Sequence, residues 1–410
     1  MSNRRNHFYV SYREAKGAAI IVATLGWLAV LAFVAIGSGE RSAFGPLKWA
    51  DFVHFYTLGD VARTHQGDLL FDNQALHARQ SALVPASSDD GFVAVYGPQT
   101  ALIFAPLSVL SYIPAGALWA VLTLGIYAWA VWLAWRPSRE VLPDRVFLIA
   151  AALAFPPVWQ LVMYGQTTAV LLVAFAGCLW ALEHDRHLLA GVALSLITVK
   201  PQWGLVLAPV FILAGEWRMI AGVLIGVGIQ IIAVVAVFDV SVFREYVEAL
   251  RSLPSVTALL EPDAYKMHSF RALTNLLPTS FDWAVWAVLT LITVWGAARL
   301  WRDRSKPWRV RFGVLVIASA LVNPHLTVYD VTVMVLPLLW IGGWLLTEPR
   351  ESTWFWQRCC WLAVALLIPT ASFIPFQITP ILVAELLFRI DRVVRSGSQP
   401  PLQVVLNGTT

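Results

Sequence analysis

Long runs of apolar residues constrain this chain more than any other feature. The first run, Gly17–Ile36, contains no charged residue, and about twenty such residues are enough for an α-helix to cross a bilayer. Helices are the expected form, because a span must satisfy its own backbone hydrogen bonds in lipid. Further apolar runs follow at 99–112, 114–135, 146–162, 168–182, 188–199, 203–214, 219–238, 283–301, 312–322, 330–346, 359–376 and 378–390. The sequence therefore predicts an all-α polytopic membrane protein with about eleven to thirteen transmembrane helices.

The overall composition supports this class. Hydrophobic residues make up 58% of the 410 residues and charged residues only 13%, whereas about a quarter of a soluble domain is charged. The net charge is only +4, and the basic residues cluster in short connectors, as the positive-inside rule describes. A nucleic-acid partner is therefore excluded, while membrane lipids are expected partners.

The distribution of Lys and Arg predicts the orientation. Arg4, Arg5, Arg13 and Lys16 precede the first run, which places the N-terminus in the cytoplasm; an uncleaved helix is favoured over a signal peptide because the run is long and more spans follow. The basic connectors 136–145, 183–187, 216–218, 302–311 and 348–358 would share the cytoplasmic side. The loops on the other side are then 37–97, 164–166, 200–202, 239–282 and 323–325.

This orientation requires residues 98–135 to cross the membrane only once. The run 99–112 is short and contains Pro106, so we interpret it as a short or re-entrant segment. If it crossed fully, the orientation of residues 164–200 would invert.

The domain organisation is simple. Residues 1–395 form one membrane domain, with a first periplasmic loop at 37–97 and a second at 239–282. The tail at 396–410 is rich in Ser, Gly, Pro and Gln, which predicts a disordered cytoplasmic segment.

The first loop is polar but rich in aromatic residues, and it is where we expect the function to lie. It contains Trp49 and the segment from Asp51 to Tyr56 among seven acidic residues. Such a mixture is typical of amphipathic helices at a membrane surface. A helix over 50–59 would place Asp51, His54, Phe55 and Leu58 on one face.

Several polar residues interrupt the apolar runs, and each has an ordinary structural interpretation. Asp51 could cap a helix, Lys200 could snorkel to the interface, Gln166 could bond a neighbouring helix and His325 could cap a turn. Lys266, His268 and Arg271 could contact solvent or lipid headgroups. Asp51, Gln166, Lys200 and His325 nevertheless all fall at one membrane face in this topology. That coincidence favours one shared cavity.

The same positions carry a resemblance to a known family. The order of Asp51 with Phe52 and Tyr56, Tyr96-Gly97-Pro98, Tyr164-Gly165-Gln166, Lys200-Pro201 and Asn323-Pro324-His325 resembles the bacterial polyprenol-phosphate-dependent mannosyltransferases of glycosyltransferase family 87. The resemblance covers roughly residues 17–345. It implies a GT-C fold and an inverting transferase whose donor is a lipid-phosphate sugar. It also implies that Asp51 in the first outer loop is the catalytic base.

The expected chemistry assigns roles to the remaining candidates. One carboxylate, Asp51, would accept the proton of the acceptor hydroxyl, and cations or donors would stabilise the leaving phosphate. His325 is a second catalytic candidate. The candidates for binding donor phosphate or substrate are Lys200, Gln166, Tyr164, Tyr96, His54, Tyr56, His268 and Arg271. The sequence contains no Asp-x-Asp pair, so we expect neither a metal nor another cofactor.

The predicted function is thus transfer of a hexose, mannose first, from a polyprenyl-phosphate donor to a lipid or glycan acceptor. We expect a monomer in the bacterial inner membrane with a periplasmic active site. Two alternatives remain open at this stage. A transporter or flippase would use intramembrane Lys and His as substrate or proton sites. A lipid-linked oligosaccharide polymerase or ligase would use the later loop, with Lys266, His268 and Arg271.

Overall fold

The computed structural model describes residues 11–260, 263–346, 349–368, 374 and 376–395, so the predicted disordered tail at 396–410 lies outside the described residues. Regular structure in these ranges is helical apart from two isolated β-bridges, Arg41–Leu47 and Met267–Thr327. The α-helices are α1 (Tyr12–Ala35), α2 (Phe52–Arg63), α3 (Asn73–Leu83), α4 (Gln99–Phe104), α5 (Tyr112–Trp135), α6 (Arg145–Leu153), α7 (Pro156–Tyr164), α8 (Thr168–Glu183), α9 (His187–Leu194), α10 (Gly204–Ala214), α11 (Trp217–Phe238), α12 (Ser241–Leu260), α13 (Phe270–Thr274), α14 (Thr279–Arg302), α15 (Trp308–Val322), α16 (Val335–Leu345), α17 (Pro349–Leu367) and α18 (Thr379–Arg395). The chain is an all-α polytopic membrane protein, as predicted.

Fewer helices are long enough to span a membrane than the eleven to thirteen predicted. Among the described residues, five segments combine sufficient length and hydropathy: Tyr12–Ala35, Tyr112–Ser138, Trp217–Phe238, Phe281–Arg302 and Val328–Leu345. A sixth is possible if α6 and α7, which are bent by 53° at their junction, act as one span. The difference arises because several apolar runs form shorter helices, namely Thr168–Glu183, His187–Val199 and Pro201–Ala214.

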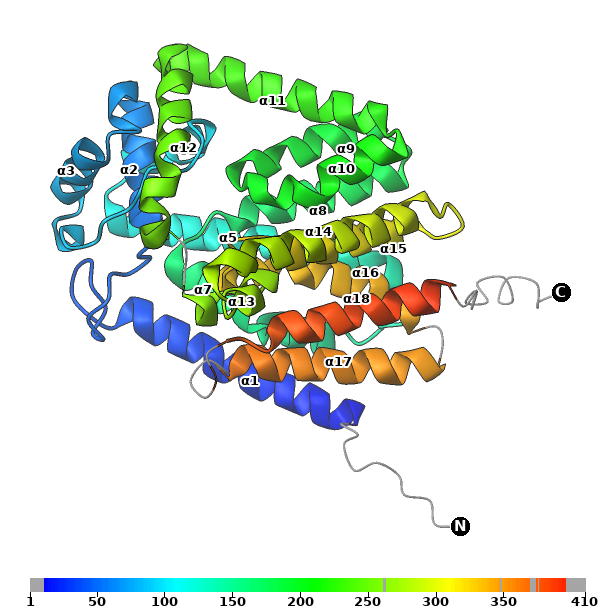
Figure 1. Cartoon of the computed structure of the whole chain (residues 1–410). Coiled ribbons are helices and arrows are strands. Elements are labelled where there is room, and N and C mark those ends of the chain that lie inside the picture. Colours follow the sequence, from blue (N-terminus) through cyan, green and yellow to red (C-terminus); the bar gives the residue numbers. More distant parts are fainter. Residues whose placement is uncertain (1–10, 261–262, 347–348, 369–373, 375, 396–410) are drawn as a thin grey trace, which may run out of the picture.

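Most of the long helices run in roughly the same direction, whereas α12 runs across them, and the start of α1 lies at the same end of the bundle as the end of α18 (Figure 1). Three of the predicted cytoplasmic connectors are near one another. Arg309 pairs with Glu183 at 2.8 Å, and the imidazole of His187 lies 3.9 Å from the carboxylate of Glu216. The connector predicted at 348–358 is instead largely helical, because α17 already begins at Pro349.

Residues 98–135 contain one long helix, as the predicted orientation requires. Helix α4 has six residues, which corresponds to about 9 Å and is too short to cross a bilayer. It packs against α2 instead. Only α5 in this region is long and apolar enough to span.

The apolar run 146–162 is broken by Pro156 and Pro157. Because a proline lacks an N–H group, Pro157 leaves the carbonyl of Leu153 without its helical donor. The indole N–H groups of Trp27 and Trp159 donate to this carbonyl at 3.0 and 2.8 Å. The carbonyl of Leu153 thus finds its hydrogen-bond donors within the protein, and the bond from Trp27 links α1 to the break between α6 and α7.

Helix α2 does not lie at the lipid–water boundary, so the prediction of a surface helix over 50–59 was wrong. Every residue from Phe52 to Ala62 is buried, and α3, α4 and α5 pack around the helix. Arg79 of α3 pairs with the buried Asp60 at 2.6 Å. The physical reason is that Phe52, Val53, Phe55 and Leu58 spread apolar surface around most of α2, while its polar side chains find partners inside the protein. The hydroxyl of Thr57, for example, donates to the carbonyl of Val53 at 2.8 Å.

Helices α9 and α11 are packed very closely, and glycines allow it. A Cβ atom at Gly191 would lie 2.0 Å from the carbonyl oxygen of Met219, and one at Gly222 would lie 2.0 Å from that of Leu188. The two backbones therefore touch, as small residues permit in membrane helices.

Candidate active site

Asp51 sits immediately before α2, but it does not cap the helix. Its side chain makes no capping hydrogen bond. Its backbone N–H donates to the carbonyl of Tyr164 at 3.1 Å, and the amide of Gln166 donates to its carboxylate Oδ2 at 2.6 Å. The carboxylate of Asp51 therefore bonds the loop after α7 and not the first turn of α2.

Gly165 fixes the position of Gln166. It ends α7 in a left-handed conformation with φ of 70°, which costs glycine little. A Cβ atom there would also lie 2.6 Å from the Cβ of Phe52. The indole of Trp119 donates to its carbonyl at 3.0 Å, so the turn that presents Gln166 to Asp51 is held from two sides.

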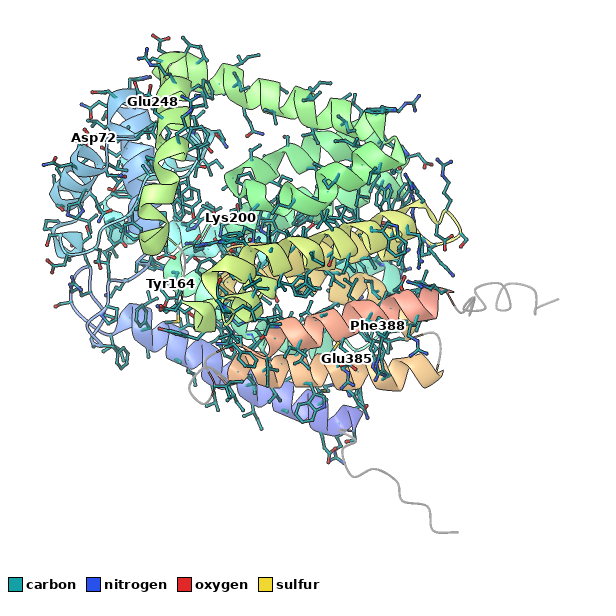
Figure 2. The ribbon with its side chains drawn as sticks, in the orientation of Figure 1. Asp72, Tyr164, Lys200, Glu248, Glu385 and Phe388 are labelled. Atoms are coloured by element: carbon teal, nitrogen blue, oxygen red, sulfur yellow. The ribbon has the colours of Figure 1, made fainter. Side chains whose placement is uncertain are left out.

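Lys200 lies next to this pair and forms a buried ion pair. It follows the 3₁₀ helix η5 (Ser195–Val199) and is 4% exposed. Its ammonium bonds Asp330 at 2.6 Å and the hydroxyl of Thr168 at 3.4 Å, and it lies 4.8 Å from the ring centre of Tyr329. Lys200 does not snorkel to the interface. Figure 2 shows Lys200 and Tyr164 in the same part of the bundle.

The electrostatics of Asp51 suit a base. The side chain is half-buried, and burial raises the pKa of Asp51 to about 6 despite the hydrogen bond from Gln166 and the charge of Lys200, both of which lower it. The charge of Asp330 raises it further. A carboxylate whose pKa lies near the working pH can accept a proton effectively and is still ionised at neutrality.

Two further loops reach this region. The bridge between Met267 and Thr327 joins the second large loop to the segment after α15, and the backbone N–H of His268 donates to the carbonyl of Leu326 at 2.8 Å. The neighbouring His325 is half-buried, and its backbone N–H bonds the side chain of Asn323 at 2.9 Å. All five loops that the topology placed on one face thus meet.

Tyr96 joins the site, and His54 lies behind it. The hydroxyl of Tyr96 interacts with Gln166 and Thr167, and burial together with the charges of Asp330 and Asp51 raises the pKa of Tyr96 well above its ordinary value. The His54 ring lies 5.9 Å from that of Tyr96 and stacks on Phe92 at 5.2 Å.

The polar groups of two other candidates are engaged elsewhere. The hydroxyl of Tyr56 donates to the carbonyl of Leu110 at 2.8 Å. Arg271 is buried, pairs with Asp282 at 3.1 Å and stacks over Trp283. The interpretation of Arg271 and His268 as solvated or headgroup-bound side chains was also wrong, because both are buried.

Sequence reasoning missed Asp330, Thr168 and Tyr329. Asp330 was counted as the first residue of an apolar run, and Thr168 likewise. A signal was present nonetheless, since an acid at the edge of an apolar run needs a partner. Lys200, at the edge of another run, is the natural one.

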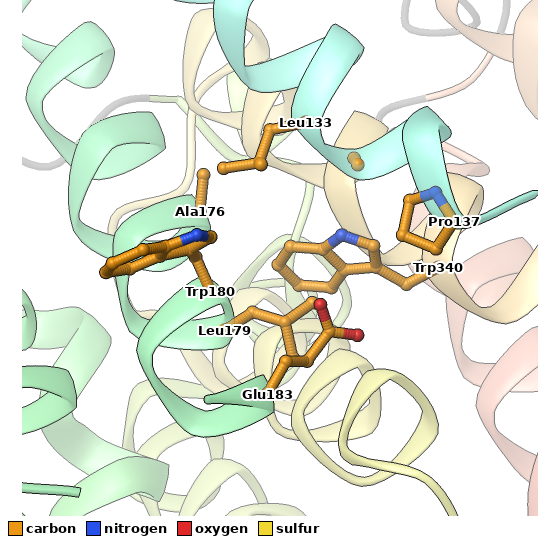
Figure 3. Close-up of a pocket in the computed structure, with 8 residues that line it drawn as sticks. Leu133, Pro137, Ala176, Leu179, Trp180, Glu183 and Trp340 are labelled. Carbon is orange, nitrogen blue, oxygen red and sulfur yellow. The ribbon is translucent and has the colours of Figure 1, made fainter. Parts of the chain in front are cut away.

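A small cavity at the other end of the bundle is separate from this site. It lies between α5, α8 and α16 and is lined by Leu133, Pro137, Ala176, Leu179, Trp180, Glu183 and Trp340 (Figure 3). Glu183 ends α8, whose first residue, Thr168, bonds Asp330. Ala176, the residue of α8 in the cavity wall that is nearest to Thr168 along the helix, is eight residues from it, or about 12 Å. The cavity is therefore separate from the loop region around Asp51.

Comparison with known proteins gives one match. Residues 94–324, more than half of the chain, match the sequence model of glycosyltransferase family 87. No curated protein matches the chain. No solved structure matches it either.

Proposed function

The chain belongs to glycosyltransferase family 87, and from this premise we propose that it is an inverting enzyme that transfers a mannosyl residue from a polyprenyl-phosphate donor. The acceptor is a hydroxyl group of a lipid or glycan on the periplasmic face of the inner membrane. The observation that carries the proposal is the half-buried carboxylate of Asp51, held by Gln166 at 2.6 Å.

The reaction needs one base. The Asp51 carboxylate takes the proton of the acceptor hydroxyl, and the oxygen attacks the anomeric carbon from the side opposite the phosphate. The bond from that carbon to the phosphate oxygen breaks, and its electron pair leaves with polyprenyl phosphate. The configuration at the carbon inverts. No acid is required, because the phosphate leaves as an anion.

The leaving phosphate gains negative charge, which nearby donors would stabilise. An ammonium has three N–H donors, and Asp330 and Thr168 accept two of those of Lys200. We assign the remaining donor of Lys200, together with His325 from the adjoining loop, to the donor phosphate. Tyr164 and Tyr96, which border Asp51, would contact the sugar or the acceptor.

The test uses purified protein in lipid nanodiscs with polyprenyl-phosphate-linked sugars and a total membrane-lipid extract as the acceptor source. We expect release of polyprenyl phosphate that depends on the sugar, with the mannosyl donor active. Asp51→Asn, which keeps the shape but not the basicity, should lower turnover at least about a hundredfold.

Asp72→Asn is the matched control from the same loop. Asp72 caps α3 through its side chain, and asparagine caps equally well, so turnover should not change. Near-normal turnover of Asp51→Asn would refute the assignment of the base.

A further inference from the structure

We propose that Asp330 is a positioning residue: it holds the ammonium of Lys200 away from Asp51, so that Lys200 and Asp51 do not form an ion pair. The inference rests on the proposed function in so far as Asp51 is the base. It adds a role for a residue outside the sequence-derived site.

The geometry supports this division of partners. Lys200 and Asp330 bond at 2.6 Å, with side chains that are 5% and 1% exposed. Asp51 instead accepts a neutral amide, that of Gln166. Gln166 and Thr168 belong to the same turn at the start of α8, and Thr168 bonds both Lys200 and Asp330. The ion pair and the base are therefore neighbours across one helical turn.

A buried ammonium requires a counter-charge. If Asp330 lost its charge, the carboxylate of Asp51 would be the acceptor left to Lys200 in this part of the site. An ion pair there would stabilise the ionised form of Asp51 and make it a poorer base.

The other titratable groups around Asp51 do not compensate for such a change. Burial lowers the pKa of both His54 and His268 to about 4, so both rings are neutral at pH 7. Lys266 is paired with Asp263 at 3.0 Å on an exposed loop. The hydroxyl groups of Tyr96, Tyr112, Tyr164 and Tyr329 also lie within electrostatic reach of Asp51.

The pair formed by Lys200 and Asp330 has no net charge, so the direction in which each substitution shifts the pKa of Asp51 can be predicted. Neutralising Asp330 leaves a unit positive charge near Asp51, whereas neutralising Lys200 leaves a unit negative charge. At an effective dielectric constant of about 20, a unit charge roughly 5–10 Å from a carboxyl group shifts its pKa by on the order of one to two units. The two substitutions must act in opposite directions.

The experiment follows the infrared band of the protonated Asp51 carboxyl group during a pH titration of the protein in nanodiscs. The band is identified by its loss in Asp51→Asn. We expect Asp330→Asn to lower the midpoint by one unit or more and Lys200→Met to raise it. Asp330→Glu, which keeps the charge, should stay near the wild type. Equal midpoints in all variants, or shifts of the same sign, would overturn the proposal.

Two control variants distinguish a local electrostatic effect on Asp51 from a general effect of misfolding. The double variant Lys200→Met with Asp330→Asn has no buried charge at this position and should return the midpoint to near the wild-type value. Asp60→Asn removes another buried, ion-paired carboxylate, on the far part of α2, and should leave the midpoint unchanged. A shift in Asp60→Asn as large as that in Asp330→Asn would show a global effect and refute a local one.

The titration needs neither donor nor acceptor, so it separates the two proposals. If Asp51→Asn abolishes transfer but Asp330→Asn leaves the midpoint unchanged, the function stands and the role of Asp330 falls. If the midpoints shift as expected but Asp51→Asn still transfers sugar, the electrostatic arrangement stands and the base is another residue.

Discussion

The contact between α9 and α11 predicts a large difference between two superficially identical substitutions on one helix. Gly222 and Gly228 both belong to α11. A Cβ atom at Gly222 would lie 2.0 Å from the carbonyl oxygen of Leu188 and 2.9 Å from the Cα of Gly191, whereas one at Gly228 would meet nothing within 4 Å. We therefore expect Gly222→Ala to destabilise the protein and Gly228→Ala to leave it unchanged or slightly more stable.

The magnitude follows from the atoms involved. Ordinary contact with a Cβ begins at about 3.4 Å, and the obstructing atoms at Gly222 belong to backbone that cannot rotate away. The two helices must separate, and overpacking of this kind costs about 1–3 kcal/mol. The better helix propensity of alanine offsets at most about 1 kcal/mol of this cost. At Gly228 only the favourable contribution applies.

Thermal unfolding of the purified variants in nanodiscs, followed by circular dichroism, measures the difference. We expect the melting temperature of Gly222→Ala to fall roughly 1–4 °C below that of Gly228→Ala. Because α9 leads through η5 to Lys200, turnover should fall as well. A melting temperature of Gly222→Ala equal to or above that of Gly228→Ala would refute the argument that backbone contact holds these helices together.

Three further predictions concern the site. Burial raises the pKa of Asp51 to about 6, and a base works in its ionised form, so initial transfer rates should fall about tenfold per pH unit below pH 6. A rate that is constant down to pH 5 would contradict this. The control His325→Gln should show the same decrease of rate at acid pH. A cysteine at position 325 should react with a membrane-impermeant maleimide from the periplasmic side only, and donor lipid should protect it; labelling from the cytoplasm would reject the orientation. Since no three His, Cys, Asp or Glu side chains of the described residues form a possible metal site, transfer should survive EDTA; loss of activity that is restored by magnesium or manganese would disprove this.

The convergence of distant loops could be predicted from the sequence because charge distribution alone determines it. Basic connectors assign the sides of the membrane, and every second connector must then share the opposite face. This reasoning brought Asp51, Gln166, Lys200 and His325 to one face without knowledge of any contact. It also required 98–135 to cross once, as the six residues of α4 allow.

The partners within the site could not be derived in the same way. Sidedness does not say which carboxylate Lys200 meets, and the apolar run after Asp330 concealed that acid as the start of a span. The burial of α2 was missed for a different reason. The polar loop around it suggested a wet surface, although Phe52, Val53, Phe55 and Leu58 spread apolar side chains around most of the helix. The pattern within the helix was the better guide than the composition of the loop around it.

The pairing of Lys200 with Asp330 also has a consequence for biogenesis. The two residues are 130 positions apart, and at 5–20 residues per second the ribosome delivers the aspartate roughly 6–26 s after the lysine. During this interval the lysine enters the bilayer region without its counter-ion, so we expect its ammonium to wait in the interfacial water. The arrival of the aspartate would then draw the ammonium inward and bring the segment that contains Asp330 onto the helices already inserted.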